Sequence, residues 1–511
     1  MKGKKIVSTL LVLLLLASLP VSAHAAVWDI GKGNITVNAG SGGQTVTQGD
    51  GAAVEDSAPV ITGSSTENTV TINAEKDQTA NVTLSDVNID VSSEGKAAVT
   101  TTGEGNVSIE LNGDNTLKSG KGHAGLEKKN GGKLTIADED KNGKLTAEGG
   151  KYGAGIGGGD QGAGSGITIT GGEIKATGGQ YGAGIGGGKG DGSDITISGG
   201  EVNATGGTSG AGIGGGYNGN GSDITITDGE VNATGGKYGA GIGGGEYGIG
   251  KDIIITGGEV NATGGRFSAG IGGGSRGTGS DITISGGEVN ASGGVNGAGI
   301  GGGLRSKGKD ITVSGDTKLK VQGGDEDHYD GAGAGIGDGG SNAYGTKILG
   351  AEVEPDTSDL LTTGWIEYYA PGADMETDDP TSTTFGTASQ PEKPIDPGAE
   401  RGMDAPLYRV TDRDGRDIAY TAEQKGGVLT VNVDEDFAIL TGRLSGIRTL
   451  KAQGVEKIVF VTKGAASAFL LSDLLGKGDS GEAYRLTHDG KAVTFTLGEK
   501  MTDVSAILTK P

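Results

Sequence analysis

A short glycine-rich core recurs along the middle of this chain at an almost constant spacing. Its first copy is Gly-Ala-Gly-Ile-Gly-Gly-Gly at residues 153–159, and the isoleucine returns with successive separations of 29, 28, 29, 29, 29 and 36 residues. The recurrent residues are Ile156, Ile185, Ile213, Ile242, Ile271, Ile300 and Ile336. A fixed period of this length is typical of a solenoid, because one repeat cannot bury its own apolar face without neighbours.

Two further short segments, residues 194–197 and 201–204 in one copy, recur in phase with the isoleucine. Strand alternation points Ile195 and Val202 inward and Thr196 outward. No apolar spacing typical of helices is present, so the repeat predicts an all-β fold. We expect a right-handed parallel β-helix whose coils of about 29 residues each hold three short strands.

Glycine accounts for 109 of the 511 residues, which fits turns at every corner of such a coil. Pairs such as Gly199-Gly200 and Gly206-Gly207 are expected at corners that need positive φ. Less regular strands precede the repeats. We therefore expect irregular coils over residues 26–150 and regular, glycine-rich coils over residues 151–350.

The two ends of the chain differ from this middle. Lysines at positions 2, 4 and 5, an apolar run at 6–19 and Ala23-His24-Ala25 are typical of a secretory signal peptide, predicted here as residues 1–25. Residues 351–405, rich in proline and acidic residues, predict a linker. Residues 406–511 have ordinary glycine content and predict a small α+β module of unknown role, with helices near 444–452 and 468–475.

The net charge of the chain limits the classes of ligand that it can bind, and the chain has no cysteine. The chain carries 65 acidic and 42 basic residues, a formal net charge of −23, and no cysteine. Such a charge disfavours nucleic acid and anionic lipid, and favours ligands that are neutral or bring cations. No second apolar stretch is long enough to span a membrane. We expect a secreted, extracellular bacterial protein that is either free or held noncovalently at the cell surface.

Outward carboxylates are predicted to stack in two columns along the repeats. One column precedes the second strand and consists of Asp194, Asp223, Asp252, Asp281 and Asp310. The other opens the third strand and consists of Glu201, Glu230, Glu259 and Glu288, after Glu173. Neighbouring charges one coil apart repel by about 0.9 kcal/mol in water. Water and salt can screen them, or the columns can hold Ca²⁺ that bridges an acidic polysaccharide.

A second calcium candidate lies in the turn at residues 138–143, where Asp138, Asp140 and Asn142 supply oxygen atoms at alternate positions. The bidentate glutamate of a calcium loop is absent, since Gly149 stands at the twelfth position. An ordinary hairpin turn is the alternative interpretation of this segment.

Aromatic and threonine side chains also recur. Tyr152, Tyr181 and Tyr238, with Phe267, come just before the first strand, where their rings can stack on sugars or cover the core. An amide ladder is expected from Asn203, Asn232, Asn261 and Asn290. The outer face of the second strand carries a threonine in most coils, and Ile254 interrupts that column.

Catalytic signals are weak, and no catalytic residue is predicted. The histidines outside the signal peptide, His123, His328 and His488, are scattered, and no nucleophile motif accompanies them. Catalytic sites break repeat symmetry, whereas these repeats are nearly identical. Repetition of this kind favours binding over a single active centre.

Residues 59–150 contain the segments 82–87, 109–117, 134–136 and 143–145, whose order of strand and turn resembles a known family. The resemblance is to secreted carbohydrate-binding parallel β-helix proteins of clostridial type, and it implies binding of acidic, pectin-type polysaccharide with calcium. We therefore expect a non-catalytic polysaccharide-binding or adhesion protein. The alternatives are a structural stalk that displays the C-terminal module, and a β-helix polysaccharide lyase or hydrolase.

Overall fold

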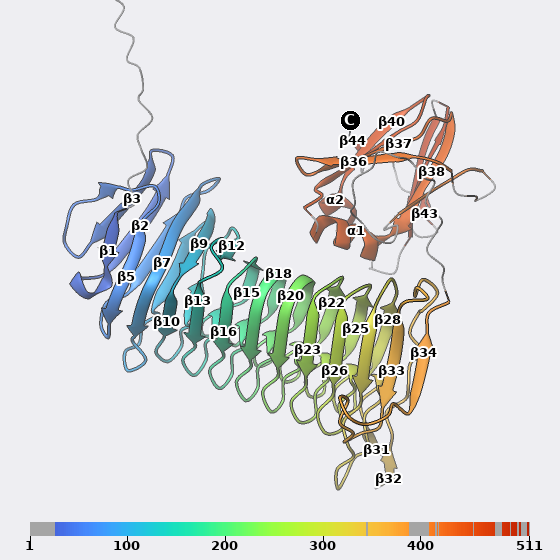
Figure 1. Ribbon diagram of the computed structural model, residues 1–511, viewed down its shortest axis with the longest axis horizontal. Helices are drawn as coiled ribbons and strands as arrows, with labels where there is room; N and C mark the ends of the chain where they lie inside the picture. The colour runs from blue at the N-terminus through green and yellow to red at the C-terminus, as the bar shows by residue number, and fades with distance from the viewer. Residues whose placement is uncertain are drawn as a thin grey trace, which may run out of the picture.

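The computed structural model describes residues 26–343, 346–387, 408–413, 416, 418–452, 454–475, 483–490, 492–497, 500–501 and 508–509. The predicted signal peptide and residues 388–407 of the predicted linker lie outside the described residues. The chain forms a right-handed parallel β-helix followed by a smaller module (Figure 1). No helix in the described ranges is long and apolar enough to cross a membrane.

Each regular coil contributes three strands, as the sequence predicts. The recurrent Ile-Gly forms a two-residue strand, and two longer strands follow it. Parallel pairing joins each strand to its counterpart one coil further on, so that Ile156 lies beside Ile185 and Ile167 beside Ile195. The short strands are β8 (Val99–Gly103), β11 (Leu126–Lys128), β14 (Ile156–Gly157), β17 (Ile185–Gly186), β19 (Ile213–Gly214), β21 (Ile242–Gly243), β24 (Ile271–Gly272), β27 (Ile300–Gly301) and β30 (Ile336–Gly337).

The longer strands form one extended sheet, which bends between the second and third strands at a residue with positive φ, a glycine in most coils and Asp86 in β7. In three coils the second and third strands are continuous, as β7 (Thr79–Asp90), β18 (Gly192–Thr205) and β20 (Gly221–Thr234). The separate second strands are β9 (Asn106–Asn112), β12 (Leu134–Ala137), β15 (Gly164–Ile169), β22 (Gly250–Ile255), β25 (Gly279–Ile284) and β28 (Gly308–Val313). The separate third strands are β10 (Asp114–Lys118), β13 (Lys144–Glu148), β16 (Glu173–Thr177), β23 (Glu259–Thr263), β26 (Glu288–Ser292) and β29 (Lys318–Gln322).

An antiparallel meander closes the N-terminal end. Strand β2 pairs in parallel with β6 and in antiparallel with β3, which in turn pairs with β4. These elements and their neighbours are β1 (Val27–Asp29), the 3₁₀ helix η1 (Ile30–Lys32), β2 (Ile35–Gly40), β3 (Gly43–Gln48), β4 (Val54–Glu55), β5 (Val60–Ser65) and β6 (Val70–Ala74). The hairpin therefore ends the short-strand sheet in antiparallel pairs.

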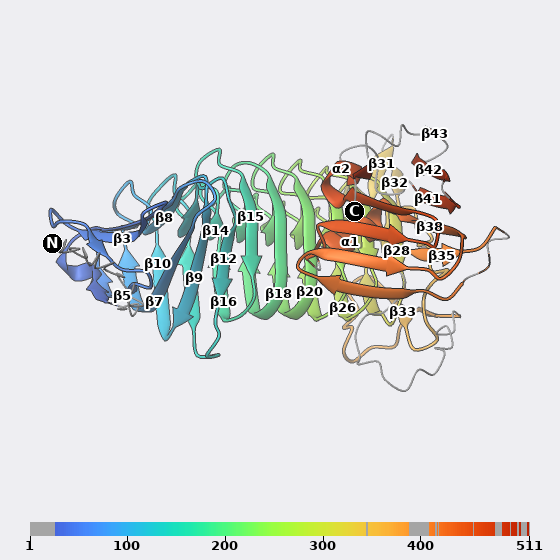
Figure 2. The ribbon, with the colours of Figure 1, turned by 90° about the horizontal axis from the view of Figure 1, so that it is seen from above.

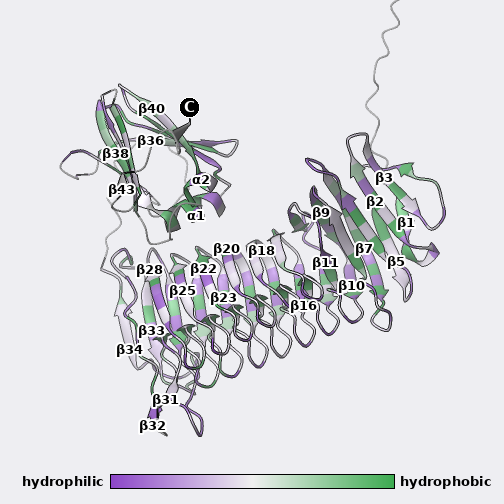
Figure 3. Ribbon diagram, turned by 180° about the vertical axis from the view of Figure 1, so that it is seen from behind, coloured by the Kyte–Doolittle hydropathy of each residue, from purple (hydrophilic) through white to green (hydrophobic). Residues whose placement is uncertain are grey.

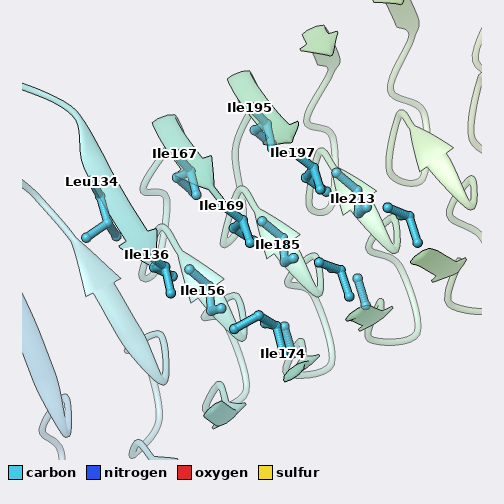
Figure 4. Packing of buried hydrophobic residues seen from close by; sticks show 14 of the residues in the cluster. Leu134, Ile136, Ile156, Ile167, Ile169, Ile174, Ile185, Ile195, Ile197 and Ile213 are labelled. Atoms are coloured by element: carbon cyan, nitrogen blue, oxygen red, sulfur yellow. The ribbon is translucent and has the colours of Figure 1, made fainter. Parts of the chain in front are cut away.

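Side chains from all three strand columns fill one narrow interior (Figure 4). Ile156, Ile185 and Ile213, from successive short strands, are fully buried, as are Ile167 and Ile195 from the second strands. Burying an aliphatic side chain of this size contributes roughly 1.5–3 kcal/mol. Because the coils stack in register, each of these isoleucines packs against isoleucine or leucine at the same position of the neighbouring coils.

Glycine serves two different purposes at the corners. Gly200 has φ +89°, as expected for a corner that needs the left-handed region. Gly207 is not among the residues with positive φ, so the expectation of positive φ at the pair 206–207 is wrong. A Cβ there would lie 1.6 Å from the carbonyl oxygen of Gly179, so glycine is required by the close approach of two coils.

Residues 351–385 close the C-terminal end of the solenoid, so the assignment of this stretch to a linker is wrong. Strand β33 (Trp365–Tyr369) pairs in parallel with β29, and β34 (Ser382–Phe385) pairs in antiparallel with β33. The Glu352 carboxylate accepts hydrogen bonds from the backbone N–H groups of Gly335 and Ile336 at 2.8 and 3.1 Å. In earlier coils the equivalent groups donate to the next coil. An unpaired strand edge favours association, which explains the cap.

The described parts of the C-terminal module form two small sheets and two helices around their own core. One sheet contains β35 (Arg409–Thr411), β38 (Phe437–Arg443), β41 (Ala483–Asp489), β42 (Ala492–Leu497) and β43 (Lys500–Met501). The other contains β36 (Thr421–Lys425), β37 (Val428–Asn432), β39 (Lys457–Val461), β40 (Ala466–Leu470) and β44 (Leu508–Thr509). Helix α1 (Leu444–Ala452) is where the sequence predicts it. Helix α2 (Leu471–Leu475) is shorter than expected, because residues 466–470 pair with β39.

A small hairpin, β31 (Ser341–Ala343) with β32 (Thr346–Ile348), projects from the last coil.

We expect Gly207→Ala to lower the free energy of unfolding of the solenoid by about 1–3 kcal/mol or more, because the added methyl group meets a backbone oxygen that cannot move aside. Gly42→Ala is the matched control, since nothing lies within 4 Å of a Cβ at that position. Urea unfolding followed by circular dichroism measures both. Equal stability of the two variants would contradict the close-approach argument.

The stability of the C-terminal module should fall in acid. His488 is fully buried, with Nδ1 3.1 Å from Thr462 Oγ1 and Nε2 2.9 Å from Ser467 Oγ. Burial lowers the pKa of His488 from 6.5 to about 4. The unfolded module binds a proton here at higher pH than the folded one, so this stabilisation is complete above about pH 6.5 and is lost as the pH falls toward 4.

The expected loss between pH 7 and pH 4 is about 3 kcal/mol. Calorimetry of the module transition at several pH values measures it, with His488→Gln as the variant that lacks this titration. If the variant shows the same pH slope as the unmodified chain, His488 is not the responsible group.

Candidate functional site

Four tyrosines form a row across successive coils. The rings of Tyr152 and Tyr181 stack with centroids 5.3 Å apart and an interplanar angle of 11°. Tyr181 meets Tyr217 edge to face at 5.5 Å, and Tyr217 meets Tyr247 edge to face at 6.2 Å. Tyr247 is exposed and the others are half-buried. The rings therefore make a continuous aromatic strip that solvent reaches.

The strip exists because two glycine turns of the solenoid meet. Tyr152 and Tyr181 come from the turn before the short strand, whereas Tyr217 and Tyr247 come from the turn after it. The backbone N–H of Tyr217 donates to the carbonyl of Tyr181 at 2.8 Å, which joins the two turns directly. The sequence analysis identifies Tyr152 and Tyr181 and misses the other two. Their recurrence within the turn that follows Gly-Ile-Gly-Gly-Gly is the signal that could have found them.

A second aromatic pair continues the strip. Tyr238 and Phe267 stack at 6.2 Å with an interplanar angle of 10°. Ser275 links this pair to the row, because its N–H donates to Tyr238 and its carbonyl accepts from the N–H of Tyr247, each at 2.9 Å. We call the six rings and the cations beside them the tyrosine edge.

Positive charges gather on this edge although the chain as a whole is acidic. Lys151 Nζ lies 5.3 Å from the ring centroid of Tyr152 and 5.9 Å from that of Tyr181. Further cations lie 4.7–5.9 Å from ring centroids of the same strip. They are Lys121 and Lys189 at Tyr152, Lys237 at Tyr238, Arg266 at Phe267 and Arg276 at Tyr247. Each exposed pair of this kind contributes about 0.5–1 kcal/mol. Arg266 also lies 3.7 Å from the Asp327 carboxylate, so the strip is most basic around Tyr152 and Tyr181, where three lysines gather.

The aspartate column has a backbone explanation. All five aspartates adopt φ between 52° and 56°, the left-handed region that aspartate tolerates better than most residues. Each lies at a kink of its second strand that recurs in the neighbouring coil, because the register passes from Ser193 directly to Ile195 on one strand and from Ser165 directly to Ile167 on the other. Gly166 occupies the same place in the preceding coil with φ +67°. Asp194, Asp223 and Asp310 are exposed, Asp281 is half-buried and Asp252 is buried.

The glutamate column is exposed and bounded by lysines. Lys144 Nζ lies 2.7 Å from the carboxylate of Glu173 at one end, and Lys318 pairs with Glu288 in the strand register at the other. Glu201, Glu230 and Glu259 lie between them in register. Lysines therefore offset part of the repulsion along this column.

The predicted amide ladder is confirmed. The side-chain N–H groups of Asn232, Asn261 and Asn290 each donate to the amide oxygen of the preceding asparagine, at 3.1, 3.0 and 2.8 Å. The ladder starts at Asn203, and it holds the outer face of the third strands in register beside the glutamates.

The segment at 138–143 is organised as a turn. The Asp138 carboxylate accepts hydrogen bonds from the backbone N–H groups of Asn142 and Gly143 at 3.2 and 3.1 Å. In the part of the chain that the structure describes, no three acidic or histidine side chains converge closely enough to hold a metal ion.

The histidines lie in three separate places. His123 Nδ1 is 3.0 Å from the buried carboxylate of Glu127, His328 meets Tyr329 edge to face, and His488 is in the core of the module. They do not combine with one another into one constellation.

A family model described as a beta helix repeat matches residues 141–160, 167–189, 195–217, 224–246, 253–275 and 282–304. No curated protein and no solved structure matches the chain significantly. The matched segments are the regular coils, so the chain carries the repeats of parallel β-helix proteins, and the tyrosine edge lies on those repeats.

We expect Asp194→Gly to change the free energy of unfolding by less than about 0.5 kcal/mol, because glycine already occupies this positive-φ position at residue 166 of the preceding coil. Asp194→Val removes the same charge but strains the left-handed backbone, at a cost of roughly 1–2 kcal/mol. Urea unfolding of the pair separates the two effects. Equal destabilisation would show that the carboxylate itself matters more than the backbone conformation.

Proposed function

We propose that the solenoid is a non-catalytic extracellular binder of acidic polysaccharide and that the tyrosine edge is its binding surface. The observation that carries the proposal is the stacked pair Tyr152 and Tyr181 with the Lys151 ammonium close to both rings. A ring and a cation side by side match the two parts of a uronic acid unit, its apolar ring face and its carboxylate.

Repetition supports a polymeric ligand. The aromatic strip runs along the solenoid axis over successive coils, about 4.8 Å apart, so one extended chain meets several rings and cations in turn. Individually weak contacts then add through effective concentration, without any deep pocket. A small ligand contacts only one or two of the repeated rings, whereas a polymer contacts many of them at once and gains binding free energy from each.

Electrostatics favour the tyrosine edge over the carboxylate columns. A polyanion is repelled by the net charge of −23 and is attracted only where cations gather. Binding along the aspartate or glutamate columns would need Ca²⁺ as a bridge. The calcium bridge is the competing mechanism for the same ligand class, and the two differ in their dependence on a chelator.

We expect Tyr181→Ala and Lys151→Ala each to weaken binding of polygalacturonate by at least about tenfold, or about 1.4 kcal/mol. Lys175→Ala is the matched control, since it removes the same charge from the exposed outer face of β16, away from the rings. Affinity electrophoresis or biolayer interferometry on the mature chain measures binding. A neutral polysaccharide in parallel should lose affinity with Tyr181→Ala but not with Lys151→Ala.

The same experiment with a chelator separates the mechanisms. Binding that persists without divalent cations and depends on Tyr181 supports the tyrosine edge. Binding abolished by the chelator and unaffected by either substitution would move the site to the carboxylate columns. No binding to any polysaccharide in either condition would overturn the proposed function and favour the stalk.

A further inference from the structure

One ion pair joins the C-terminal module to the outer face of the solenoid. The guanidinium of Arg448, on α1, donates from Nη1 to the carboxylate of Asp252, on β22. Both side chains are withdrawn from water, with exposed fractions of 16% and 7%. The two residues are 196 positions apart in the sequence. Figure 2, seen from above, shows the module lying over this flank of the solenoid.

Burial along the outer face changes at the same place. Outward residues of the second strands are exposed or half-buried in most coils, as Asp194 and Thr196 are. Around β22 the equivalents become buried: Asp252 is 7%, Ile254 3% and Thr225 8% exposed. Nearly identical coils serve as internal controls, so the difference reflects a second layer over this part of the face.

The sequence departs from its own repeat at this point. The outer position of the second strand is threonine at 168, 196, 225, 283 and 312, and isoleucine only at 254. Ile254 points away from the interior, because its neighbours Ile253 and Ile255 point inward, and it is absent from the inner core cluster. An outward isoleucine that is buried is an apolar anchor for whatever covers it.

Charge adds to this complementarity. Asp223 and Asp281 flank Asp252 in neighbouring coils and are close enough to act on it electrostatically. Arg448 thus approaches this column of carboxylates from helix α1 of the module. Lys251 Nζ also lies 3.6 Å from the Asp252 carboxylate, so two cations offset the repulsion between this buried carboxylate and the neighbouring aspartates.

We propose that the outer face of β22 and its neighbours is a docking site for this chain's own C-terminal module, with Arg448 as the charged contact and Ile254 as the apolar anchor. The loops that follow β16, β23 and β26 project from the opposite side of the solenoid (Figures 1 and 3). These loops begin the turns that carry Tyr181 and Phe267. Docking therefore covers part of the aspartate column and leaves the tyrosine edge open.

The test uses the whole mature chain, which contains no cysteine. Thr205→Cys on the solenoid and Ser472→Cys on α2, both exposed, accept a fluorescent donor and acceptor. We expect the parent chain to show one population with high energy transfer. Arg448→Glu should shift at least half of the molecules to low transfer, and adding Asp252→Lys to it should restore the high-transfer population.

Ile254→Thr tests the solenoid side without altering the module, because it restores the residue found in the other coils. It should release the module in the same assay, whereas Asp194→Asn, two coils away, should not. A parent chain with low transfer, or an Arg448→Glu variant that stays at high transfer, would overturn the docking proposal. Circular dichroism confirms that each variant remains folded.

Polysaccharide binding is measured on the same variants. Retained affinity in the released Arg448→Glu chain supports separate surfaces, and a change of more than about threefold would contradict them. If the parent chain binds no polysaccharide, the energy-transfer result still decides the docking proposal by itself.

Discussion

In-register stacking of one coil on the next is the constraint on which this structure depends. Every strand beyond the ends obtains its backbone partners from the coils above and below, and every inward isoleucine packs on its equivalent. Coils approach so closely that a Cβ at Gly207 would overlap the carbonyl oxygen of Gly179. The glycine content is therefore a requirement of backbone approach as much as of turn conformation.

Stacking also repeats each surface residue from coil to coil, including charged residues that repel one another. A carboxylate in one coil becomes a column, and an asparagine becomes a ladder. Within the ladder the two inner amides, Asn232 and Asn261, both donate and accept. Carboxylates only accept, so their columns need lysines at the ends, as at Lys144, or an incoming cation such as Arg448. Although the chain as a whole is acidic, cations gather beside the aromatic turns at Tyr152 and Tyr181.

Periodicity in the sequence was sufficient to predict the β-helix, its three strands per coil and the inward residues. It could not predict which turns touch, since Tyr217 and Tyr181 are brought together by a hydrogen bond between turns on opposite sides of a short strand. Nor could composition reveal the cap at 351–385, because a closing segment meets only one coil and carries no repeat. Glu352 acts there through its carboxylate in place of a backbone partner, which no periodic pattern encodes.

Departures from the repeat are the informative positions in such a molecule. A residue that matches its equivalents is explained by stacking alone, whereas one that differs needs a local cause. Ile254 replaces a threonine on an outer face, where an apolar side chain gains nothing unless it is covered. It lies in the coil whose aspartate meets Arg448 and whose outer residues are buried. The isoleucine at 254, the ion pair between Arg448 and Asp252, and the change in burial all occur at β22. A second layer over that coil accounts for all three.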